Sequence, residues 1–86
     1  METSAFEPRS GDLAPGGIPW LARMIDKARA DAGGTIGEYM YPCPMDQALL
    51  AELRIGAEEF QRIALDSKSD DDVVRALGAR AKAGRP

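Results

Sequence analysis

The residues best suited to chemistry gather in one short stretch, TIGEYMYPCP at positions 35–44, with Asp46 close behind it. This stretch holds Tyr39, Tyr41 and Cys43, the single cysteine of the chain. We expect a helix to begin directly after it. A helix N-terminus favours a thiolate through its dipole and its free N–H groups. Cys43 is therefore a candidate nucleophile or redox-sensing thiol, and the alternative is a small buried cysteine in a loop.

The sequence contains no histidine. Its absence excludes Ser-His-Asp and Cys-His nucleophile systems, histidine general bases and zinc sites that contain histidine. Activation of Cys43 would then depend on the helix end and on a cation, either Lys27 or an arginine. The carboxylates of Asp26, Glu38 and Asp46 match no spacing of metal ligands. We predict no metal site and no cofactor.

Charged residues of the first predicted helix form a second candidate site. Lys27 and Arg29, together with Glu38 and Tyr39, are candidates for binding a small anionic ligand. The alternative is a solvated helix face on which Lys27 pairs with Asp31 across one turn. In an extended segment, Tyr39 and Tyr41 share one side and form an aromatic contact patch, or they pack on the helices. The predicted binding residues are Asp26, Lys27, Arg29, Glu38, Tyr39, Tyr41 and Asp46.

The overall composition limits the class of protein. A chain of 86 residues is one domain at most and has room for only a thin core. The net charge of −3 argues against a nucleic-acid partner, which needs a basic face. No apolar run approaches the ~20 residues that span a bilayer, and no signal peptide is recognisable. With one cysteine and no disulfide, the expected location is cytoplasmic.

The pattern of apolar residues predicts an all-α fold, a small bundle of three to four short helices with an irregular loop after the first. Residues 1–17 form an extended N-terminal arm, residues 18–83 one helical domain, and residues 84–86 a frayed tail. The predicted helices run from Pro19 to the Gly33-Gly34 pair, from Met45 to Leu53, from Ala57 to Ser67, and from the N-cap Ser69 onward.

The same pattern assigns the core. Leu13 and Ile18 are expected to anchor the arm, and Met45 is expected on the apolar face of the second helix. Lys27 is expected on a polar face of the first helix. The apolar stripe of this first helix comprises Trp20, Leu21, Met24, Ile25, Ala28 and Ala32. The angled second and third helices are similar to a helix-turn-helix, but the acidic residues of the third would repel phosphate.

The run LARMIDKARADAGGTIGEYMYPCPMDQALL, with LRIGAEEF and SDDDVV after it, resembles a small bacterial family defined only as domain of unknown function 5069. The most specific parts of this resemblance are IDKARA at 25–30, GEY at 37–39 and Asp46. Arg54 stands where the family usually has glycine, and Ala76 where a tryptophan is expected. The resemblance implies one folding unit and no particular activity, substrate or ligand.

Three functions follow from these residues. The first is a non-catalytic module that binds a protein partner or itself, with no nucleic acid and no membrane involved. The second is a thiol-dependent enzyme or redox sensor that uses Cys43. The third is a domain that binds a small anionic ligand.

Overall fold

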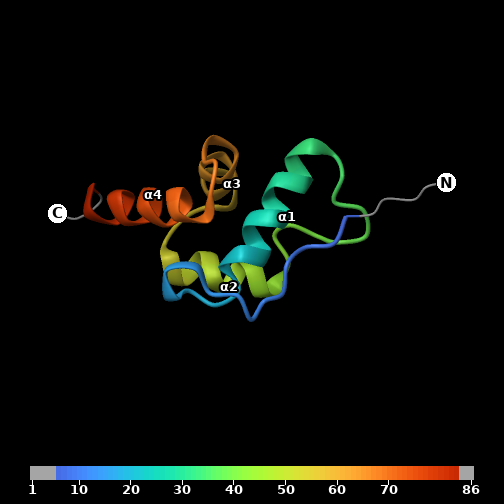
Figure 1. The fold of residues 1–86 in the computed structure, drawn as a ribbon, viewed down its shortest axis with the longest axis horizontal. Coiled ribbons are helices and arrows are strands. Elements are labelled where there is room, and N and C mark those ends of the chain that lie inside the picture. Colours follow the sequence, from blue (N-terminus) through green and yellow to red (C-terminus); the bar gives the residue numbers. More distant parts are fainter. Residues whose placement is uncertain (1–5, 84–86) are drawn as a thin grey trace.

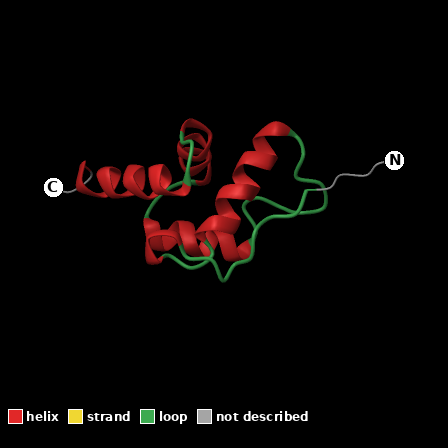
Figure 2. Ribbon diagram, viewed as in Figure 1, coloured by secondary structure: helices red, strands yellow, loops and turns green. Residues whose placement is uncertain are grey.

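The computed structural model describes residues 6–83, with side chains up to residue 80. Within that part of the chain, all regular secondary structure is helical (Figures 1 and 2). The predicted tail at 84–86 lies outside the described residues. A short 3-10 turn precedes four α-helices: η1 Pro15–Gly17, α1 Leu21–Gly33, α2 Pro44–Leu53, α3 Ala57–Asp66 and α4 Asp70–Ala83. The all-α prediction is confirmed.

The core forms where α1 meets the other helices. In Figure 1, α1 crosses above α2, α3 stands beside α1, and α4 runs outward to the C-terminal end. The apolar face of α1 supplies the largest share of the core, and the other helices close over it. The hydrophobic core consists of Leu21, Met24, Ile25, Ala28, Leu49, Leu50, Ile55, Phe60, Ala64, Val73 and Leu77.

The first helix begins at Leu21, two residues later than Pro19. The backbone of Trp20 is left-handed, with φ 75°, so this residue cannot continue a right-handed helix. Ala32 is exposed, contrary to the predicted stripe, and Ala22 is buried in addition. The start of α1 is thus fixed by one backbone conformation that helix propensity does not predict.

The assignment of Lys27 to a polar face is wrong. Its side chain is only 3% exposed, because its ammonium group finds a buried carboxylate on α2. The expected pair with Asp31 is replaced as well, since Asp31 accepts a hydrogen bond from Gln61 of α3. Lysine is tolerated inside a protein when its charge is paired in this way.

The N-terminal arm docks along α1, but with different anchors from those predicted. Ile18 packs against the core as expected, whereas Leu13 is 47% exposed. The space against this part of the arm is filled by Trp20. A Cβ atom on Gly11 would lie 2.5 Å from the Trp20 ring, and the backbone N–H of Trp20 donates to the Gly11 carbonyl. Glycine is therefore required at position 11 by close approach of the indole.

The loop over residues 34–43 contains no strand and leads directly into α2. Cys43 is the N-cap of α2, which begins at Pro44, one residue before the predicted start at Met45. Met45 is 57% exposed, so its place in the core is wrong. Asp46 is turned inward instead, with no exposed surface. A carboxylate that has buried partners thus sets which face of α2 points to the core.

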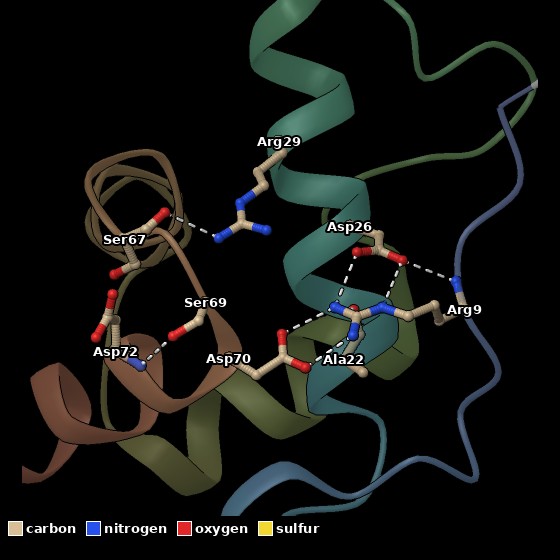
Figure 3. A network of polar contacts seen from close by, with 8 residues as sticks. All are labelled: Arg9, Ala22, Asp26, Arg29, Ser67, Ser69, Asp70 and Asp72. Carbon is tan, nitrogen blue, oxygen red and sulfur yellow. Dashed lines mark hydrogen bonds and ion pairs between the residues drawn. The ribbon is translucent and has the colours of Figure 1, made fainter.

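The last two helices begin as the sequence predicts. Gly56 is the N-cap of α3, and the Ser69 hydroxyl accepts a hydrogen bond from the Asp72 N–H at the start of α4 (Figure 3). The third helix ends at Asp66, one residue early. Among the helices described, none has the length and apolar character needed to cross a membrane.

Arg54, the C-cap of α2, is left-handed, with φ 58°. A non-glycine residue in the left-handed conformation costs about 1–2 kcal/mol. Glycine avoids this cost, but it loses more backbone entropy on folding, which cancels part of the gain. We therefore expect Arg54→Gly to raise the free energy of unfolding by about 0.5–1 kcal/mol in urea titrations. Ala48→Gly, at an exposed site within α2, should lower it by about 1 kcal/mol. Equal losses in both variants would contradict strain at Arg54.

Candidate functional site

An ion pair between Lys27 of α1 and Asp46 of α2 lies inside the protein. The Lys27 Nζ is 2.8 Å from the Asp46 Oδ2, and the two side chains are 3% and 0% exposed. Asp46 also accepts hydrogen bonds from the Trp20 indole Nε1 at 2.7 Å and from the Cys43 backbone N–H at 3.0 Å. Removing two charges from water is costly, and these additional donors help to offset that cost.

The sulfur of Cys43 completes this group. Lys27 Nζ donates to Cys43 Sγ at 3.1 Å, and the Asp46 N–H lies 3.5 Å from the same sulfur. The thiol therefore caps α2 in a reciprocal arrangement with Asp46. Cys43 as a residue is half-buried, whereas Lys27 and Asp46 are almost fully enclosed. We call Lys27, Cys43 and Asp46 the buried cluster.

A second polar network fastens the arm to the helices, and sequence reasoning missed its central residue. The Arg9 guanidinium forms ion pairs with two helices: its Nε lies 3.0 Å from Asp26 Oδ2 of α1, and its Nη1 lies 2.7 Å from Asp70 Oδ2 of α4 (Figure 3). Its hydrogen bonds to Asp70, and then to Asp26, raise the pKa of the Arg9 guanidinium. The reciprocal hydrogen bond lowers the pKa of Asp70, although burial opposes the shift. No sequence signal marks an arginine in an irregular arm as a tie between two helices.

Arg29 is occupied by the end of α3. Its guanidinium donates to the backbone carbonyls of Ala64 and Ser67 at 2.9 and 3.1 Å. Figure 3 shows it reaching across to Ser67. Terminal carbonyls have no partner within their helix, so Arg29 serves as a C-terminal cap from a neighbouring helix. The structure does not join it to Lys27 in one ligand site.

The two tyrosines take different roles. Tyr41 is half-buried, and its hydroxyl donates to the Ala57 carbonyl at 2.6 Å. Burial, and then the negative charges of Asp46 and Asp31, raise its pKa. Tyr39 is 36% exposed and lies against the Arg23 guanidinium, 5.5 Å from the ring centroid. They therefore do not form a single aromatic patch.

The cation of Arg23 is held between aromatic rings. Its guanidinium lies 5.3 Å from the Trp20 ring centroid and 5.5 Å from the Tyr39 ring centroid. Phe6 of the arm meets Tyr39 edge to face, with 5.6 Å between centroids. This stack ties the arm, α1 and the loop together. It was not predicted, although the aromatic residues at 20 and 39 were both noted in the sequence.

Of the predicted site residues, the fold brings together Lys27, Cys43 and Asp46. Asp26 joins the Arg9 network, and Glu38 is an exposed loop residue. Within the described part of the chain, no three His, Cys, Asp or Glu side chains lie close enough to hold a metal ion.

The fold defines a small helical domain whose first helix makes the main polar contacts. The family model described as Domain of unknown function (DUF5069) matches residues 6–86, and the chain belongs to that family. No curated protein matches the chain.

The buried cluster predicts a large effect of removing one charge. Lys27→Met leaves the Asp46 carboxylate buried without its cation, and we expect a loss of about 3–5 kcal/mol in the free energy of unfolding. The double variant Lys27→Met/Asp46→Asn carries no uncompensated charge and should regain part of that loss. Urea titrations of both variants check this. A double variant less stable than the single variant would contradict it.

The lowered pKa of Asp70 predicts a pH dependence. Because the folded pKa lies below the ordinary value of 3.8, this carboxylate stabilises the fold above that pH, and its contribution is lost as the pH falls further. Asp70→Asn should cost about 1 kcal/mol at neutral pH, and the difference from wild type should shrink below about pH 4. Asp71→Asn is the control, because Asp71 is exposed on the same turn. A deficit of Asp70→Asn that is constant with pH would contradict the assignment.

Proposed function

We propose that this protein is a non-catalytic assembly module that associates with a second copy of itself through the loop before α2. The observation that carries the proposal is the exposure of Met40 and Met45, at 59% and 57%. Tyr39 precedes Met40 in the loop and Met45 lies in the first turn of α2, so three exposed large apolar side chains fall within residues 39–45. We call Tyr39, Met40 and Met45 the loop surface.

The charged residues support this proposal because the fold already uses them. Asp26 holds the arm, Lys27 holds α2, and Arg29 caps α3. These are the charged residues of the IDKARA motif, so that motif is explained by folding contacts. The side chains left to meet a partner at this end of the molecule are those of the loop surface.

Contacts with α1, α2, α3 and the arm hold the loop in one conformation. The Tyr41 hydroxyl bonds to α3, and the Cys43 N–H and sulfur bond to Asp46 and Lys27. Arg23 of α1 and Phe6 of the arm contact Tyr39. A loop that is ordered before binding loses less conformational entropy on association.

A second copy is the occupant that these features favour. Methionine side chains adapt to one another, and a two-fold interface places the same surface on both partners. A domain of this size has a thin core and gains stability from association. The acidic net charge supports a protein partner over nucleic acid, and the unpaired thiol supports a cytoplasmic location.

Light scattering after size exclusion, over a range of protein concentrations, tests the proposal. We expect the wild-type mass to rise to that of a dimer, and Met40→Glu or Met45→Glu to restore the monomer, because a buried unpaired charge opposes association. Leu65→Glu is the matched control, since Leu65 is 54% exposed but lies on α3. A wild-type protein that stays monomeric at every concentration, or a dimer unaffected by both methionine variants, would refute self-association through this loop.

A further inference from the structure

The buried cluster places a lysine amino group in direct contact with a thiol. A primary amine, Lys27 Nζ, lies 3.1 Å from a half-buried thiol, Cys43 Sγ. The lysine side chain is 3% exposed, so its amine is held against the sulfur and has little freedom to leave. Cys43 is the more exposed residue of the pair, and a small oxidant would approach from its side.

We propose that Lys27 and Cys43 are a redox modification site, at which oxidation of the thiol by a peroxide joins the two side chains covalently. In the first step the sulfur attacks the peroxide, an S–O bond forms, the O–O bond breaks, and water leaves. Cys43 is then a sulfenic acid, which is the first and reversible stage of cysteine oxidation.

The second step is condensation with the neighbouring amine. Lys27 first gives one ammonium proton to the Asp46 carboxylate, 2.8 Å from Nζ, and becomes an amine with a free lone pair. The Lys27 nitrogen then attacks the sulfur, an S–N bond forms, and the S–O bond breaks. A second N–H proton joins the departing hydroxyl group as water, and the first proton stays on Asp46 or passes to solvent. One peroxide is consumed, two water molecules leave, and the product is a sulfenamide. Sulfenic acids are known to condense with nitrogen nucleophiles in this way.

Competing reactions are few within this chain. Sulfenic acids are usually resolved by a second thiol, and the chain has only one cysteine. Among the described residues, the Asp46 backbone N–H also approaches the sulfur, at 3.5 Å. An amide nitrogen is a weaker nucleophile than an amine and is farther away. The Lys27 amine is therefore the partner that the geometry favours.

The link would close residues 27–43 into a covalent ring that contains Tyr39 and Met40. It would also replace an ion-paired ammonium with a neutral nitrogen beside Asp46. Oxidation would thus constrain the loop that carries Tyr39 and Met40. This inference does not depend on self-association, because a monomer carries the same pair of atoms.

Intact-mass measurement of the purified full chain, treated with hydrogen peroxide and kept free of reductant, tests the proposal. We expect a loss of two hydrogen atoms, reversal by a thiol reductant, and fragment ions that join the Lys27 and Cys43 peptides. The same join carrying one added oxygen would also support the link, as the product of a second peroxide. Wild-type protein in urea should not form it.

Two variants provide the controls. Cys43→Ser removes the sulfur. Lys27→Arg keeps a cation beside Asp46 but replaces the nucleophilic amine with a guanidinium that stays protonated. Neither should form the link, and circular dichroism reports whether each is folded. If Lys27→Arg does not fold, the fragment ions of the wild-type protein decide the question alone. Oxygen addition without joined peptides, a Cys43 disulfide between two chains, or a link to another lysine would overturn the proposal.

Discussion

The ion pair between Lys27 and Asp46 is the constraint on which the rest of the structure depends. Each charge is buried and has the other as its counter-ion, at 2.8 Å. An arrangement of α1 and α2 that separated them would leave two buried charges unpaired, at a cost of several kcal/mol. The pair therefore fixes how the start of α2 sits on α1. The loop between these helices, which carries Tyr39 to Cys43, is fixed as a consequence.

Around this pair, α1 connects the remaining segments through polar side chains that radiate from it. Asp26 reaches the arm through Arg9, and Arg29 reaches the end of α3. Arg23 lies between Trp20 and Tyr39. A small domain buries little apolar surface, so contacts of this kind help to choose one arrangement among several that would cover the same apolar face. They also explain why so many charged residues fall in one short helix.

The sequence predicts the helices well and the site only in part. Helix ends are encoded locally: Gly34, Gly56 and Ser69 each act as the sequence predicts. A reactive thiol needs a nearby cation, and for Cys43 the sequence leaves that cation open between Lys27 and an arginine. Met45 and Leu13 were placed in the core wrongly, because apolar periodicity takes no account of a buried carboxylate at 46 or of an indole above Gly11. The role of Arg9 depends on contacts 17 and 61 residues away, which no local pattern contains.

The most direct test of the central claim is the nuclear magnetic resonance signal of the Lys27 side-chain nitrogen in the folded protein. An ammonium group enclosed between Asp46 and Cys43 exchanges its protons slowly with water, so its ¹⁵N-bound protons should be visible and close in space to the Trp20 indole proton. Lys68 is exposed and provides the reference within the same molecule. Slow exchange at Lys27 alone is the predicted result. Exchange at Lys27 as fast as at Lys68 would contradict the buried pair and the account built on it.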